Sequence, residues 1–106
     1  ILGVAYKQDI DDYRESPAID VINILKENGA KVDFYDPFIP KYKHNGKFFE
    51  GLEKIEPQIV SEYDLVMITA GHSNVDYEMV QRHAVAVFDT KNAMKKVANR
   101  NNIEVL

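Results

Sequence analysis

The stretch GVAYKQDIDDYRESPA, residues 3–18, decides the fold and indicates a ligand site. It begins within an apolar run, Ile1 to Ala5, which predicts a short buried strand. A polar loop with Lys7, Arg14 and three aspartates follows and ends at Ser16-Pro17. That pair predicts a helix start, because a serine hydroxyl caps free helical N–H groups and proline lacks an N–H that would be unpaired there. The loop therefore joins a strand end to a helix N-terminus.

A loop in this position is suited to hold an anionic ligand. Ligands of open α/β sheets collect at the carboxyl ends of strands, and a helix N-terminus favours phosphate. Lys7 adds a point charge, and Arg14 adds a planar fork that can grip a phosphate with two hydrogen bonds. Spacing alone leaves an alternative open, in which the charged residues only pair with one another on a solvated surface. These residues are Lys7, Asp9, Asp11, Asp12 and Arg14.

The rest of the chain alternates predicted strands with predicted helices. Strands are expected at 1–5, 31–35, 65–69, 85–88 and 103–106, with a short extended stretch at 52–55. Helices are expected at 17–28, 57–62 and 75–82, and a helix or turn at 93–99. Gly29 is expected to end the first helix in a left-handed conformation. The segment from 38 to 51 has no clear period and is interpreted as an excursion loop. Alternation of this kind predicts an α/β fold, a three-layer, Rossmann-like, doubly wound and mainly parallel sheet.

Composition limits the possible functions. The chain has 106 residues, 45% of them hydrophobic, which is enough for a single domain over 1–106 with one core. A net charge of -4 argues against nucleic-acid and membrane-surface partners. There is no cysteine, hence no thiol nucleophile and no thiolate metal site, and the histidines show no metal-binding spacing. Because the chain starts inside an apolar strand without Met, we expect it to be a fragment of a larger protein.

Three segments resemble one enzyme family. Residues Gly3 to Lys7 with Asp11 to Pro17, then Tyr35-Asp36-Pro37, then Phe88 to Asn92, are similar in order and spacing to motifs of the UDP-glucose/GDP-mannose dehydrogenase family. The resemblance covers essentially the whole chain and corresponds to the C-terminal, nucleotide-sugar-binding domain. The exact residues of the first and last motifs are most similar to those of the branch that acts on UDP-N-acetylglucosamine and UDP-N-acetylmannosamine.

The resemblance implies a role for each matching residue. Tyr6 and Lys7 match a pair that lies against the nucleotide sugar, and Lys91 matches a basic residue that contacts the substrate. Lys91 stands where many relatives have arginine, so a bidentate grip becomes a point charge. Arg14 matches an arginine that reaches across a domain interface to NAD. No catalytic residue and no metal ligand is expected in the chain.

The resemblance also implies the context of these residues. It points to an NAD-dependent UDP-sugar 6-dehydrogenase, a cytoplasmic enzyme of polysaccharide biosynthesis that oxidises a primary alcohol to a carboxylate. The catalytic cysteine and the main NAD site are expected on preceding NAD-binding and central domains. The first turn here has only Gly3 and lacks the G-x-G-x-x-G of a dinucleotide site, so the chain alone is expected to be inactive.

Several polar residues have two interpretations. For Asp36 we favour a role in ending its strand and fixing the next turn over a role as a ribose ligand. Asp89 is expected to cap a turn or orient Lys91. Asp11 and Asp12 are expected to shape the loop rather than act as a metal or acid–base pair. His72 is either a residue of the ligand cleft or a hydrogen-bonded loop residue.

Two rival functions stay open from the sequence. A non-enzymatic phospho-receiver domain is also doubly wound, with an acidic pair after its first strand. A receiver needs an aspartate at the end of the YDLVMI strand, where this chain has Thr69. A stand-alone nucleotide-binding module is the other rival.

Overall fold

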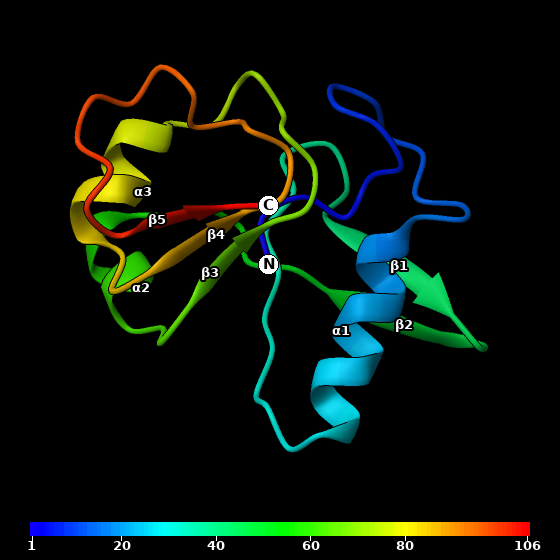
Figure 1. Cartoon of the computed structure of the whole chain (residues 1–106). Helices are drawn as coiled ribbons and strands as arrows, with labels where there is room; N and C mark the ends of the chain where they lie inside the picture. Colours follow the sequence, from blue (N-terminus) through cyan, green and yellow to red (C-terminus); the bar gives the residue numbers. More distant parts are fainter.

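The computed structural model describes residues 1–106 and contains a parallel sheet with helices against it (Figure 1). Three strands form its regular part, β3 (Val66–Ile68), β4 (Val87–Asp89) and β5 (Ile103–Val105), in the order β3-β4-β5. Parallel bridges add Leu2 beside Ile68 and Tyr35 beside Leu2. The spatial order is therefore Tyr35, Leu2, β3, β4, β5. This confirms the Rossmann-like α/β fold.

The predicted first and second strands are reduced to single bridges at Leu2 and Tyr35. Leu2 N–H donates to Met67 and Gly3 N–H donates to Tyr35, so this segment pairs on both sides in the middle of the sheet. Gly3 then takes a φ of 91°, which takes the chain out of extended geometry. The next two N–H groups consequently need partners other than a neighbouring strand.

Helix α1 (Pro17–Glu27) begins and ends as the sequence predicts. Ser16 is its N-cap, and the Ser16 hydroxyl oxygen accepts from Ala18 N–H at 3.3 Å. Gly29 has a φ of 91° and Ala30 N–H donates back to the Leu25 carbonyl, which gives a left-handed C-terminal cap. α1 packs against an apolar cluster with Val4, Ala18, Ile22, Phe34 and Tyr42 at its centre.

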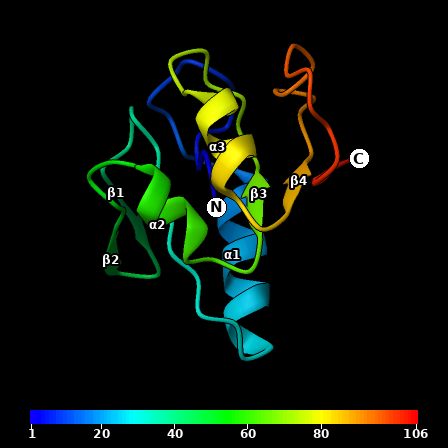
Figure 2. The ribbon, with the colours of Figure 1, turned by 90° about the vertical axis from the view of Figure 1, so that its left-hand side faces the viewer.

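Helices α2 (Pro57–Ser61) and α3 (Tyr77–His83) contact each other and lie on one side of the strands, as Figure 2 shows. They cover a second apolar cluster that includes Val60, Val66, Ile68, Val80 and Val87. Crossovers between parallel strands are right-handed, and the strand order reverses at Leu2, so α1 lies on the opposite face. The sheet is wound in both directions.

The expected excursion loop at 38–51 contains an antiparallel hairpin, so that interpretation was wrong. Its strands are β1 (Lys41–His44) and β2 (Lys47–Glu50), with Tyr42 opposite Phe49. Asn45 and Gly46 both have positive φ, 50° and 79°, as a two-residue hairpin turn requires. Tyr42 is buried and stacks on Phe49 at 5.2 Å between ring centroids, whereas Phe48 is exposed. The hairpin thus covers the α1 cluster.

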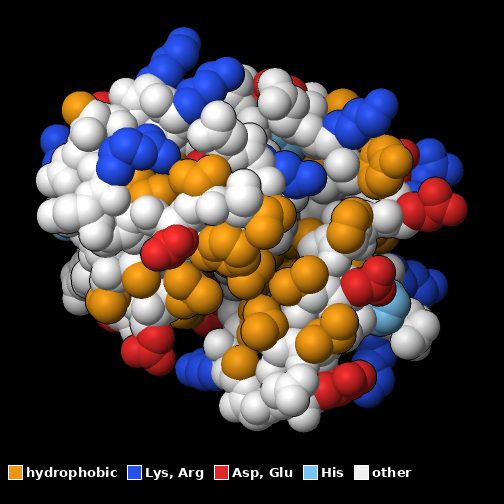
Figure 3. All heavy atoms as spheres, in the orientation of Figure 1, with side chains coloured by type: hydrophobic (Ala, Val, Ile, Leu, Met, Phe, Trp, Pro, Cys, Tyr) orange, Lys and Arg blue, Asp and Glu red, His pale blue; other side chains and the backbone are white.

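The remaining boundaries lie within two residues of those expected. Residues 93–99 form turns rather than a helix, and 52–55 form no strand. Val66 and Val87 are buried on one face of the sheet. Met67 and Phe88, the next residues along the two strands, pair with each other on the opposite face and are only half-buried. Figure 3 shows apolar side chains gathered on the face turned toward the viewer, between the part with β3 to β5 and the part with α1.

Candidate functional site

Four loops leave the sheet at the carboxyl ends of its parallel strands. We call this side the carboxyl edge; its loops are residues 5–16, 36–40, 69–76 and 90–97. Figures 1 and 2 both show the loops after Ala5, β3 and β4 along the same upper side of the molecule. In doubly wound sheets this edge, near the point where the strand order reverses, is where ligands bind. That point is Leu2 here, and the loop after it carries Lys7.

Asp36 binds the main chain at the start of two of these loops, 5–16 and 36–40. Its side chain is buried, and Oδ2 accepts from the N–H groups of Val4 at 2.9 Å and Ala5 at 3.2 Å. Oδ1 accepts from Phe38 N–H at 2.8 Å and Ile39 N–H at 3.2 Å. Asp36 thus supplies the partners that the segment after Gly3 lacks and also fixes its own turn. The expectation that Asp36 is structural is confirmed.

Asp89 does the same for the loop after β4. It is fully buried, and its carboxylate accepts from the N–H groups of Lys91 at 3.1 Å, Ala93 at 3.0 Å and Met94 at 2.8 Å. Asn92 within this turn has a φ of 54°. The expected capping role of Asp89 is confirmed. Its consequence is that Lys91 has a fixed backbone and an exposed side chain.

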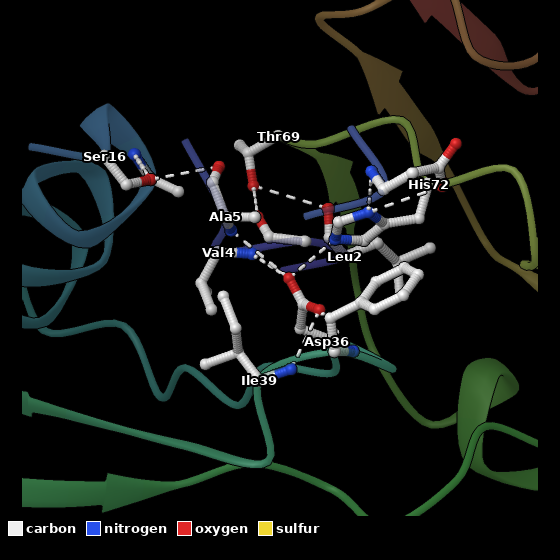
Figure 4. Close-up of polar contacts among 12 residues, drawn as sticks. Leu2, Val4, Ala5, Ser16, Asp36, Ile39, Thr69 and His72 are labelled. Carbon is white, nitrogen blue, oxygen red and sulfur yellow. Dashed lines mark hydrogen bonds and ion pairs between the residues drawn. The ribbon is translucent and has the colours of Figure 1, made fainter. Parts of the chain in front are cut away.

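His72 is a buried hydrogen-bonded loop residue, so its side chain does not face a solvent-filled cleft. Only 1% of His72 is exposed. Its Nε2 lies 2.8 Å from Asp36 Oδ2, and its Nδ1 accepts from Asp9 N–H at 2.8 Å (Figure 4). Tyr77 OH donates to the His72 carbonyl at 2.7 Å, and Phe38 packs on the ring. His72 therefore joins three loops of the carboxyl edge.

The loop over residues 5–16 presents the predicted substrate residues to solvent. Tyr6 is 49% exposed, and Lys7 is exposed with its Nζ 5.9 Å from the centre of the Tyr6 ring. Asp9, two residues on, accepts from Ser73 N–H at 2.7 Å and Ser73 Oγ–H at 2.9 Å. These bonds lower the pKa of the Asp9 carboxyl below its usual value.

Arg14 points away from the core and pairs with Asp12. Its Nε donates to Asp12 Oδ1 at 3.0 Å and its Nη2 to Oδ2 at 2.9 Å. The Arg14 side chain is 85% exposed. Hydrogen bonds from Arg14 lower the pKa of Asp12 to about 2, and the same pairing raises the pKa of Arg14. Neither of these bonds involves Nη1, and together they fix the orientation of the guanidinium.

The structure thus places Tyr6, Lys7 and Lys91 on loops of one edge, with Arg14 at the far end of the first loop. The loop after β3 lies between the two lysines: Asp9 bonds to it, and Gly71 in it faces Lys91.

No group of three metal-ligating side chains is present. No helix is long and apolar enough to cross a membrane. Thr69 stands where a receiver would need its aspartate, and it donates its hydroxyl hydrogen to a main-chain carbonyl.

Two features of the site were not found from the sequence. Asp36 was assigned to its own turn, but its bonds to Val4 and Ala5 span more than 30 residues. The His72 bond to Asp9 spans 63 residues. Only the bonds of Asp36 had a sequence signal. Gly3 interrupts the first strand, so N–H groups after it need acceptors, and an aspartate at the end of the neighbouring strand can supply them.

The strand order defines a doubly wound α/β domain, and its exposed cations lie at the edge where such domains bind ligands. The model of the UDP-glucose/GDP-mannose dehydrogenase family, UDP binding domain, matches residues 1–96, and the chain belongs to this family.

Relatives agree with this assignment. A UDP-N-acetyl-D-mannosamine dehydrogenase from Methanococcus maripaludis is 31% identical over 103 residues, which cover 90% of this chain and 22% of that protein. The protein of that name from Methanocaldococcus jannaschii is 34% identical over 104 residues, 91% of this chain and 23% of its own length. A solved UDP-N-acetyl-mannosamine dehydrogenase from Staphylococcus aureus superposes with a TM-score of 0.70 and 28% identity, over 98% of this chain and 25% of its own. The chain thus spans about a quarter or less of these proteins.

Proposed function

We propose that this chain is the C-terminal, substrate-nucleotide part of an NAD-dependent UDP-sugar 6-dehydrogenase that converts a UDP-N-acetylhexosamine or UDP-glucose to the uronate. The observation that carries the proposal is the pairing of exposed cations with buried anchors at the carboxyl edge. Lys7 and Lys91 are exposed, yet Asp36 and Asp89 hold the backbone beside each of them. Fixed backbones hold the two lysines in defined positions, which suits the binding of an anionic ligand. The names of the relatives supply the substrate class.

In this proposal Lys7 and Lys91 bind the diphosphate and sugar end of the substrate, and Tyr6 lies against the nucleotide. The loop after β3 lies between them, and its Gly71 packs closely against Ala93 of the loop that carries Lys91. Both residues are lysines, so each contributes a point charge rather than a bidentate fork.

NAD belongs to another part of the longer protein. The chain has no glycine-rich dinucleotide loop and no cysteine, so its own residues do not form a complete cofactor or catalytic site. We assign only Arg14 to the cofactor, through the Nη1 side that Asp12 leaves available. NAD would accept hydride from the substrate, and the role of Arg14 is to bind a phosphate of NAD.

The preceding NAD-binding and central domains are the partners that complete this enzyme, and we place the assembly in the cytoplasm. These relatives are roughly four times as long as this chain, which supports the presence of such domains. The half-buried face with Met67 and Phe88 is suited to pack against them, because apolar faces of this kind are costly to leave in water.

Kinetics of two variants in the full-length protein test the proposal. Lys7→Ala is expected to raise KM for the UDP-sugar, and Arg14→Ala to raise KM for NAD, each by about tenfold to a hundredfold, since a charge-assisted bond contributes roughly 1.5 to 3 kcal/mol. Lys31→Ala, an exposed lysine away from the carboxyl edge, is the control. If both test variants keep the wild-type KM values, the loop is a solvated surface without a binding role and the proposal is wrong.

A further inference from the structure

His72 is buried among the loops of the carboxyl edge, and the proposed function gives it no part. Because Nδ1 accepts the Asp9 N–H, the ring proton lies on Nε2, and Nε2–H donates to the Asp36 carboxylate (Figure 4). The ring is therefore neutral and has no bonding capacity left. Neutral imidazole is well suited to this position, because it needs one acceptor and one donor on opposite sides.

These two bonds hold the chain on both sides of Tyr6 and Lys7. On one side, Asp36 binds the N–H groups of Val4 and Ala5 immediately before Tyr6. On the other side, His72 binds the N–H of Asp9, two residues after Lys7. The His72–Asp36 bond joins the two attachment points to each other.

Asp9 is fastened by its side chain as well as by its backbone. Its φ is 61°, in the left-handed region that Asp adopts more readily than most residues with a side chain. Beyond the His72 contact, the Asp9 carboxylate accepts two hydrogen bonds from Ser73. Backbone and side chain of Asp9 are thus both fastened to the loop after β3.

We propose that His72 is a positioning residue for nucleotide-sugar binding, which fixes the turn that presents Tyr6 and Lys7 by accepting from the Asp9 N–H. This inference rests on the proposed function, in which Lys7 meets the substrate. It differs from a purely structural role in one respect. A structural role predicts that stability alone changes when His72 is replaced, whereas positioning predicts a loss of affinity that follows the Nδ1 acceptor.

Two substitutions separate the two ring nitrogens. His72→Asn keeps an oxygen near the Nδ1 position, and His72→Gln keeps an N–H near the Nε2 position. Affinity for UDP is measured by titration calorimetry on the chain, with thermal unfolding of each variant alongside. We expect His72→Asn to bind within about threefold of wild type and His72→Gln about tenfold more weakly, the equivalent of one lost hydrogen bond. Equal affinity of folded His72→Gln and wild type would overturn the proposal, as would equal losses in both variants.

A further variant tests the second attachment of the same turn, the bonds between the Asp9 carboxylate and Ser73. Asp9→Gly tolerates the positive φ but removes the carboxylate attachment, and its matched control is Asp11→Gly, an exposed aspartate in the same loop. We expect a several-fold loss of UDP affinity for Asp9→Gly and less than twofold for Asp11→Gly. Because Asp9→Gly keeps the N–H that His72 accepts, a loss in this variant supports the premise that the attachment of Asp9 positions Lys7, and the two His72 variants test the ring itself.

Lys7→Ala is measured in the same series to separate the two levels of inference. If Lys7→Ala binds UDP as wild type does, the proposed function of the loop fails, and the positioning role falls with it. If Lys7→Ala binds weakly while folded His72→Gln and Asp9→Gly bind normally, the substrate site stands and only the role of His72 is wrong.

Discussion

Replacing Asp36 by asparagine is expected to destabilise the domain severely, although the side chain keeps its shape. The Asp36 carboxylate meets four main-chain N–H groups and the Nε2–H of His72. An amide has only one oxygen. If that oxygen keeps the two bonds at Oδ1, the NH₂ group faces three donors at the Oδ2 position, those of Val4, Ala5 and His72.

The structure sets the size of the effect. Each bond to a charged group contributes roughly 1.5 to 3 kcal/mol, and an unsatisfied buried N–H costs about 1 to 3 kcal/mol. Relaxation of the loop will recover part of the three lost bonds, so we expect a net loss of about 3 to 5 kcal/mol. That is a large share of the 5 to 15 kcal/mol typical of a domain.

Urea unfolding of the chain, followed by circular dichroism, measures the change. A loss of about 3 kcal/mol lowers the midpoint by more than about 1 M for typical urea slopes. Asp64→Asn, an exposed aspartate that makes no hydrogen bond in the structure, is the control and should shift the midpoint little. A variant Asp36→Asn as stable as Asp64→Asn would refute the reasoning that Asp36 holds the edge together.

Three further predictions follow from single contacts. Gly3→Ala should destabilise the chain by about 2 kcal/mol or more in the same urea assay, because the added Cβ would lie 2.5 Å from Ala70 Cβ at a φ of 91°; a neutral effect would contradict the close approach. The Asp12 carboxyl should titrate near pH 2 by carbon NMR, so that its contribution to stability is complete above the unfolded pKa of about 4 and lost as pH falls towards 2, and Arg14→Ala should return the pKa to its usual range; an unchanged pKa in that variant would exclude the ion pair. Burial raises the pKa of Tyr77 to about 12, so stability should fall as pH rises from 10 to 12, and tyrosinate absorbance should show this late titration; titration of every tyrosine near pH 10 in the folded chain would contradict it.

Local signals predicted the parts of the fold that depend on neighbours in sequence. Ser16-Pro17 predicted the start of α1, and Gly29 predicted its end, since capping involves residues within one turn. The turn residues Asn45-Gly46 carried an equally local signal for the hairpin, which the absence of a clear period in the flanking segment concealed. Tyr42 and Phe49 become an evident pair only once that turn is recognised.

Contacts between loops were beyond such signals. The family motif indicated Lys7, Arg14 and Lys91, but nothing in the spacing showed that His72 would bind the main chain of Asp9. That contact depends on how two loops 63 residues apart meet at the edge of the sheet. Position along the sequence identifies the loops of such a site, whereas the bonds between loops follow from the packed structure.

The most direct test of the central claim is an amide NMR titration of the chain with UDP. If the carboxyl edge binds the nucleotide, the amide signals of Tyr6, Lys7 and Lys91 should shift in a saturable way, and those of the hairpin turn at Gly46 should not. Saturable shifts confined to residues away from this edge, or no saturable shift at millimolar UDP, would contradict the assignment of this edge as the nucleotide-sugar site.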